Sequence, residues 1–180
     1  MLEQLIVLMK KNALIHQASL FIGVHEIGHN SGIMVRKFQS KIGRAQNEPW
    51  CMSFVQYMVG SIDDLFYALV GANHKATRLY PSEHVLTVWE KTPSEFKCCD
   101  NPQVGDIVIW SRDTTSKSFK PGHTGLVMEV HGDGTITTIE GNTSQDGEIV
   151  REGEGVYRKT RRIDPRKQGI FNLEGFISPW

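Results

Sequence analysis

The chain has 180 residues, of which 39% are hydrophobic and 22% are charged. This is the composition of a globular domain with a sizeable core, and it excludes a disordered chain or a coiled coil. Twenty Lys and Arg residues balance twenty Asp and Glu residues. The chain therefore lacks the basic excess that binding to nucleic acid or to an anionic membrane requires, and we expect neither partner.

The chain begins with a segment that predicts a buried helix. Its apolar residues recur at helical spacing, at Leu2, Leu5, Ile6, Met9 and Ala13. Glu3 interrupts the apolar run and Lys10-Lys11 follows it, so the run fits neither a signal peptide nor a membrane span. We therefore expect a protein made in the cytoplasm without a signal peptide and without membrane insertion.

Three further helices are predicted in the first half of the chain. One should follow Pro49, with an apolar stripe on one face formed by Phe54, Val55, Met58 and Val59. Residues 62–70 predict another helix. Residues 81–90 predict a third, which Pro81 is well placed to begin.

After about residue 104 the pattern changes to short β-type runs separated by turn-forming residues. These runs lie at 106–110, 125–130, 135–139, 156–160 and 174–178. Helices over 1–104 followed by antiparallel strands over 105–180 predict an α+β fold. No linker or repeat divides the chain, so we expect a single domain over residues 1–180.

Residues 25–29 match the H-E-x-x-H pattern of zinc peptidases, in which two imidazoles one helical turn apart bind the metal. That chemistry requires a helix through His25, Glu26 and His29. Gly28 lies inside the motif and the turn-forming sequence Asn-Ser-Gly follows it, which favours a helix end and a polar loop. We keep the zinc site as the minority hypothesis.

A cysteine, Cys51, lies at the start of the helix predicted after Pro49. The N-terminus of a helix offers unpaired backbone N–H groups and a positive dipole end, both of which favour a thiolate. The alternative is a small buried hydrophobic side chain. The other two cysteines, Cys98 and Cys99, are adjacent; this odd set is no disulfide framework and indicates synthesis in a reducing compartment.

Two neighbouring strands can supply a base and a group that orients it. If these strands turn at Gly132-Asp133, paired residue numbers add up to about 265, which puts His123 opposite Asn142 with Glu140 as a diagonal neighbour. Imidazole, carboxylate and amide are then within reach of one another. This is the arrangement that holds a catalytic base in one tautomer.

A local basic stretch is formed by Arg158-Lys159, Arg161-Arg162 and Arg166-Lys167. Alternate side chains of a strand share a face, so Arg158 and Arg162 are expected to line one rim, usually as solvated surface. An acidic polymer such as cell-wall glycan is the alternative partner for it.

At these residues the sequence resembles the CHAP family (cysteine, histidine-dependent amidohydrolases/peptidases), which are papain-like relatives of the NlpC-type cell-wall peptidases. The resemblance runs through most of the chain. It is carried in order by segments 22–32, 48–55, 104–110, 122–127, 138–144, 155–161 and 175–179. The ordered combination of Cys51 with G-D-I-V, G-H-x-G and E-G-N is the specific part.

The resemblance implies a papain-like or NlpC-type fold and a catalytic role for each of four residues. Cys51 would attack an amide carbonyl, His123 would act as base and then acid, Glu140 would orient the imidazole, and Asn142 would position His123 or the substrate. The candidates for substrate contact are Trp50, Trp110 and Gln46, with Gln46 also the candidate second oxyanion donor. Residues 41–47 contain no acidic residue, so the calcium loop of some family members is not expected, nor is any other metal or cofactor.

The resemblance also implies a function. We expect thiol-dependent hydrolysis of bacterial peptidoglycan, as an N-acetylmuramoyl-L-alanine amidase or an endopeptidase. The expected role is that of a monomeric phage or prophage lysin that acts on the cell wall after release, and a secreted interbacterial toxin is the alternative. The rival functions are the zinc peptidase and a non-catalytic wall-binding relative.

Overall fold

The structure is a computed structural model that describes residues 2–43, 47–71, 76–113, 121–145, 153–164, 166–168 and 170–180. The helices come first: α1 (Leu2–Ser19), α2 (Ile33–Ser40), α3 (Cys51–Val70), α4 (Val85–Lys91) and the 3-10 turn η2 (Ser94–Phe96). The strands follow: β1 (Lys97–Cys98), β2 (Ile107–Arg112), β3 (Gly122–Val130), β4 (Thr135–Thr143), β5 (Gly155–Arg162), β6 (Lys167–Gln168) and β7 (Phe171–Ile177). This order confirms the α+β class.

All the strands join one antiparallel sheet in the order β1-β7-β2-β3-β4-β5, with β6 paired to β7. The hairpin of β3 and β4 has the predicted register on the side away from its turn, where Leu126 pairs with Ile139 and Val127 with Thr138. A bulge after Val127 shifts the pairing by one residue near the turn. The hairpin therefore directs the side chains of His123 and Glu140 as the sequence predicts.

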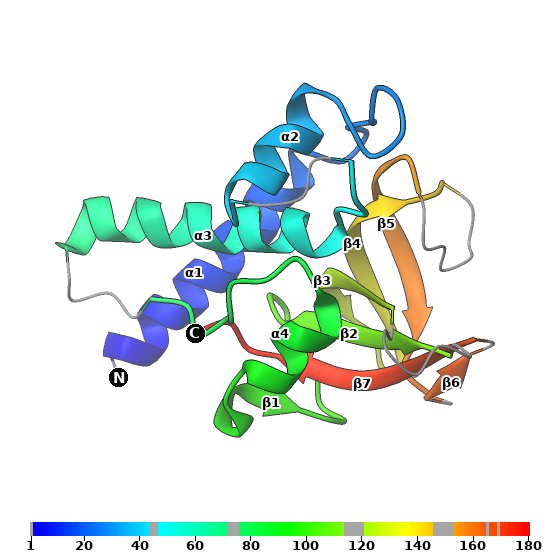
Figure 1. Cartoon of the computed structure of the whole chain (residues 1–180). Helices are drawn as coiled ribbons and strands as arrows, with labels where there is room; N and C mark the ends of the chain where they lie inside the picture. The colour runs from blue at the N-terminus through cyan, green and yellow to red at the C-terminus, as the bar shows by residue number, and fades with distance from the viewer. Residues whose placement is uncertain are drawn as a thin grey trace.

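Each face of the sheet carries its own apolar cluster, because successive strand residues point to opposite sides. One face, which includes Ile107 and Ile109, packs in a single core with α1, α3 and α4 (Figure 1). The opposite face carries Val108, Trp110, Val127, Ile136, Phe171, Leu173 and Phe176 as a second cluster. The sheet is thus buried on both faces where β2 and β3 lie, which fixes the strands that carry the site.

The prediction that α1 buries its Leu2, Leu5 and Met9 face is wrong. These side chains are 71%, 52% and 52% exposed. The buried positions of α1 are Lys10, Leu14 and Ala18. Apolar residues surround this helix rather than forming one stripe, and the charge of Lys10 is compensated inside the core by Asp63, whose carboxylate lies 2.8 Å away. Periodicity alone therefore did not identify the buried face.

Two other helix predictions need correction. Residues 62–70 do not form a separate helix but continue α3, which packs Phe54, Val55, Met58 and Val59 into the core as predicted. The interior Gly60 is explained by the Lys41 side chain, which occupies the space that a Cβ at this position would fill. Pro81 does not begin α4, because the helix starts four residues later at Val85. No helix among the described residues has both the length and the hydropathy to span a membrane.

Candidate active site

Cys51 is the first residue of α3, so its thiol lies at the N-terminal end of a 20-residue helix. Trp50 precedes it as the N-cap and provides no side-chain cap. The first backbone N–H groups of an α-helix have no partner within the helix, and they form the positive end of its dipole. Cys51 is 6% exposed. The Cys51 side chain thus lies at the positive end of the helix dipole and is almost fully buried.

The His123 imidazole connects Cys51 to a buried carboxylate. Its Nε2 atom lies 2.8 Å from Oε2 of Glu140, and the ring also forms a hydrogen bond with the side chain of Cys51. Since Nε2 is engaged by Glu140, Nδ1 is the nitrogen that remains for the thiol. His123 and Glu140 are 1% and 0% exposed. The structure thus brings together three of the four predicted catalytic residues.

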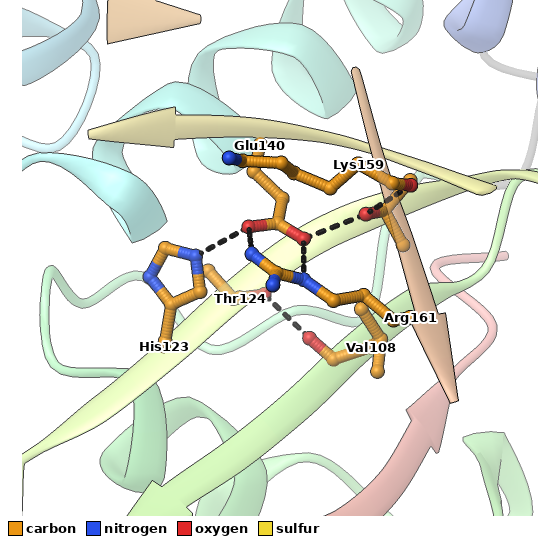
Figure 2. Close-up of polar contacts among 7 residues, drawn as sticks. Val108, His123, Thr124, Glu140, Lys159 and Arg161 are labelled. Carbon is orange, nitrogen blue, oxygen red and sulfur yellow. Dashed lines mark hydrogen bonds and ion pairs between the residues drawn. The ribbon is translucent and has the colours of Figure 1, made fainter. Parts of the chain in front are cut away.

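Glu140 accepts further hydrogen bonds from two residues besides His123 (Figure 2). Arg161 on β5 donates through Nε to Oε1 at 2.8 Å and through Nη2 to Oε2 at 2.7 Å. Thr138 donates its hydroxyl proton to Oε1 at 2.6 Å. A bidentate guanidinium holds a carboxylate in one plane, so Arg161 fixes the orientation of Glu140 and shares the oxygen Oε2 with His123.

Trp110 on β2 supports both cationic groups. Its ring stacks on the His123 imidazole with centroids 5.9 Å apart and an interplanar angle of 20°. The guanidinium carbon of Arg161 lies 5.9 Å from the centroid of the same indole. Trp110 is the Cα partner of His123 in the β2–β3 ladder. It is 1% exposed, and its expected contact with substrate stays a prediction.

The charges of the site favour an ionised Glu140 and a protonated His123. Burial alone would raise the pKa of Glu140, but the hydrogen bonds and charges of Arg161 and His123 hold that pKa well below its usual range. Burial opposes protonation of His123, whereas its hydrogen bonds with Cys51 and Glu140 and their charges raise its pKa to about 9. The imidazolium is therefore the main form of His123 at neutral pH.

Gly125 explains why the Glu140 side chain fits between the strands. A Cβ at this position would lie 2.6 Å from Cγ of Glu140 and 3.1 Å from the carbonyl oxygen of Ile139. The second glycine of the G-H-x-G segment thus leaves the space that the carboxylate arm crosses on its way to His123. Gly141 similarly admits α3, since a Cβ there would lie 2.7 Å from Cβ of Phe54.

The other predicted site residues have different outcomes. Asn142 is fully buried and has a left-handed backbone with φ of 54°; its catalytic role stays a prediction. Trp50 is 0% exposed and stacks on Phe38, and its expected contact with substrate stays a prediction. Gln46 lies outside the described residues.

Arg161 is the residue that the sequence analysis did not single out. The basic stretch was read as solvated surface or as a contact for an acidic polymer, but Arg161 and Lys159 are 4% and 5% exposed. Alternation along β5 leaves Arg158 and Arg162 exposed on the same face of the strand, as the sequence predicts. Two features could have indicated that Arg161 is buried: the alternation of side chains along a strand and the pairing of β5 with β4.

The H-E-x-x-H segment does not form a helix, so its imidazoles lack the one-turn spacing that the zinc hypothesis requires. His25 forms an isolated β-bridge with Gly155 and hydrogen-bonds Tyr157 through Nδ1 at 3.2 Å. Glu26 instead accepts hydrogen bonds from the indole N–H of Trp50 at 3.2 Å and the backbone N–H of Asn30 at 3.1 Å. Within the described ranges, no three His, Cys, Asp or Glu side chains are grouped to hold a metal ion.

Comparison with known families identifies the class to which this fold and site belong. A family model described as the CHAP domain matches residues 43–142. Because the match spans more than half of the chain, the chain belongs to the CHAP-domain family, which is generally a family of hydrolases. No curated protein and no solved structure gave a significant match. The matched segment contains Cys51, His123, Glu140 and Asn142 and ends before β5, which carries Arg161.

Proposed function

We propose that the protein is a thiol-dependent peptidoglycan hydrolase whose nucleophile is Cys51. The observation that carries this proposal is the contact of one buried imidazole, His123, with both the Cys51 thiol and the Glu140 carboxylate. A cysteine at a helix N-terminus beside an oriented histidine is suited to nucleophilic attack on an amide. Membership of the CHAP-domain family supports a cell-wall amide as the substrate.

In the proposed reaction, the proton of the Cys51 thiol already resides on the His123 imidazolium before substrate binds, and the Cys51 thiolate attacks the amide carbonyl carbon. A C–S bond forms, and the carbonyl becomes an oxyanion near the free N–H groups at the start of α3. The C–N bond then breaks as the His123 imidazolium donates its proton to the leaving amine. This leaves a thioester on Cys51.

Water completes the cycle in the second half of the reaction. His123, now neutral, removes a proton from the water molecule that attacks the thioester carbonyl. The products are a carboxylic acid and the free thiol. Glu140 remains ionised throughout and keeps the Nε2 side of His123 fixed, so that Nδ1 stays directed at the reacting atoms.

The finer role that we propose is that of a phage or prophage lysin, a monomer that acts on the cell wall after release. The resemblance of segment 22–32 to phage-lysin-like relatives supports this role. The scissile bond is either the muramoyl–L-alanine amide or a peptide bond in the stem or cross-bridge. The two cuts leave different new amino groups, which mass spectrometry distinguishes.

The test is the release of soluble fragments from purified peptidoglycan by the wild type, Cys51→Ala and His123→Gln. Cys99→Ser serves as the matched control, because Cys99 is an exposed cysteine outside the proposed site. We expect release by the wild type and the control, with or without a zinc chelator, and none above background by the other two. Release by Cys51→Ala that a chelator abolishes would overturn the proposal.

A further inference from the structure

We propose that Arg161 is a positioning residue of the active site, which acts on the reaction by holding the Glu140 carboxylate in the orientation that His123 requires. This inference rests on the proposed catalytic roles of Cys51, His123 and Glu140, but not on the identity of the substrate. Arg161 lies 19 positions beyond the end of the matched family segment, on the neighbouring strand of the sheet. The pairing of β5 with β4 brings Arg161 to Glu140.

The first argument is geometric. The Arg161 guanidinium donates to both oxygens of Glu140, and one of these, Oε2, is the oxygen that faces Nε2 of His123. A rotation of the carboxylate would therefore break the contact with Arg161 and the contact with His123 together. Figure 2 shows the carboxylate between the two side chains, with Arg161 reaching it from β5.

The second argument is electrostatic. Glu140 is fully buried, and burial is the largest single influence on the pKa of its carboxyl group. Burial raises that pKa and so opposes ionisation. The hydrogen bond from Arg161 is the strongest opposing influence, ahead of the hydrogen bond from His123. A neutral carboxyl could not support a buried imidazolium, so Arg161 keeps Glu140 in the form on which the raised pKa of His123 depends.

The third argument concerns how Arg161 itself is held. Its guanidinium lies over the Trp110 indole, whose ring also stacks on His123. The Trp110 indole thus packs against both the Arg161 guanidinium and the His123 ring and restricts the position of each. Lys159, the other buried cation on this face of β5, is paired in the ladder with Thr138. The contacts of the Arg161 guanidinium are thus with Glu140 and Trp110, and we propose that its effect on the reaction passes through Glu140.

The experiment compares Arg161→Lys and Arg161→Met with Arg158→Met, a control on the exposed face of the same strand. The first readout is the ¹³C shift of the Glu140 side-chain carboxyl across pH, assigned by its loss in Glu140→Gln. We expect no titration of Glu140 between pH 4 and 9 in the wild type, in Arg158→Met or in Arg161→Lys. In Arg161→Met the carboxyl should titrate inside that window, because the strongest influence that keeps Glu140 ionised is lost.

The second readout is turnover. We expect kcat for fragment release to fall about tenfold to a hundredfold in Arg161→Met, with KM unchanged, because a small misplacement of catalytic groups slows the chemical step. Arg161→Lys keeps the charge but not the two-point contact, so its kcat should fall while Glu140 stays ionised. Arg158→Met should match the wild type in its carboxyl titration.

Three results would overturn the inference. The first is an Arg161→Lys protein with wild-type kcat, and the second is an Arg161→Met protein in which Glu140 stays ionised to pH 4 with kcat unchanged. The third is an Arg161→Lys protein that fails to fold, which would assign Arg161 to stability. If the wild type releases nothing from peptidoglycan, the proposed function fails, but the carboxyl titration still decides whether Arg161 controls Glu140.

Discussion

His123 Nε2 and Glu140 Oε2 lie 2.8 Å apart, although 17 positions and a hairpin turn separate the two residues in the chain. Both side chains are buried; His123 lies on β3 and Glu140 on the next strand, β4, beyond the paired part of the hairpin that ends at Leu126 and Ile139. A hairpin is the shortest way to bring a base and its orienting carboxylate together on one face. The nucleophile comes from the helical layer, so the site forms where the two parts of the fold meet.

The first prediction concerns Glu140→Gln. The neutral amide removes the charge that supports the imidazolium and leaves the Arg161 guanidinium without its carboxylate partner. We expect kcat for fragment release to fall by roughly 10²–10⁴-fold, as for loss of a group that orients a catalytic histidine. The exposed Glu129 of β3 provides the control, and a Glu140→Gln enzyme as active as Glu129→Gln would contradict this role.

The second prediction concerns stability against pH. The pKa of His123 is raised in the folded protein from 6.5 to about 9. The native state therefore binds the proton more tightly than the unfolded state, and this stabilisation is complete below pH 6.5 and lost as the pH rises through 9. Its size is about 3 kcal/mol for a shift of this magnitude.

Urea denaturation of the wild type and of His123→Gln measures this effect. The free energy of unfolding of the wild type should fall relative to that of His123→Gln between pH 6.5 and 9.5. A difference between the two proteins that stays constant over this range would show that His123 is not protonated preferentially in the folded state.

The third prediction concerns the room that Gly125 provides. An alanine Cβ would overlap the Glu140 side chain, so Gly125→Ala should lower kcat at least tenfold and destabilise the fold by about 1–3 kcal/mol. Gly132, in the turn between the same two strands, has nothing within 4 Å of the corresponding Cβ. Gly132→Ala should therefore keep wild-type kcat and stability; equal losses in the two variants would refute the explanation.

The fourth prediction separates the thiol site from the H-E-x-x-H segment. His29 is exposed and lies in a turn rather than on a helix. We expect His29→Ala to release fragments within about twofold of the wild-type rate, because surface substitutions have small effects. A zinc peptidase that uses His25 and His29 as ligands would lose nearly all its activity, so a comparable loss here would revive that hypothesis.

Much of the site was predictable because it depends on local patterns. Pro49 and the apolar stripe of α3 predicted a helix with Cys51 at its start, and the turn at Gly132-Asp133 predicted the register that joins His123 to Glu140. That register survived the bulge after Val127, because the bulge lies between the turn and the site. Short-range geometry was thus sufficient to bring base and carboxylate together.

The rest depends on contacts between distant segments, which the sequence pattern does not contain. In the sequence, Arg161 and Lys10 look like surface cations. Their burial becomes clear only in the fold, where β5 lies beside β4 and brings Arg161 to Glu140, and where α3 lies beside α1 and brings Asp63 to Lys10. The sequence pattern likewise did not predict that Trp50 and Trp110 are buried in the core, where Trp110 stacks on His123. Burial of charged and aromatic side chains is decided by their partners, and the partners are fixed only by the tertiary fold.

The most direct test of the account is an NMR titration of the His123 ring in the wild type, Cys51→Ala and Glu140→Gln. The account predicts a pKa near 9 in the wild type and a lower pKa in each variant, because Cys51 and Glu140 both stabilise the imidazolium. A His123 ring that titrates near 6.5 in the wild type and does not respond to either substitution would contradict the claim that Cys51, His123 and Glu140 form one coupled unit.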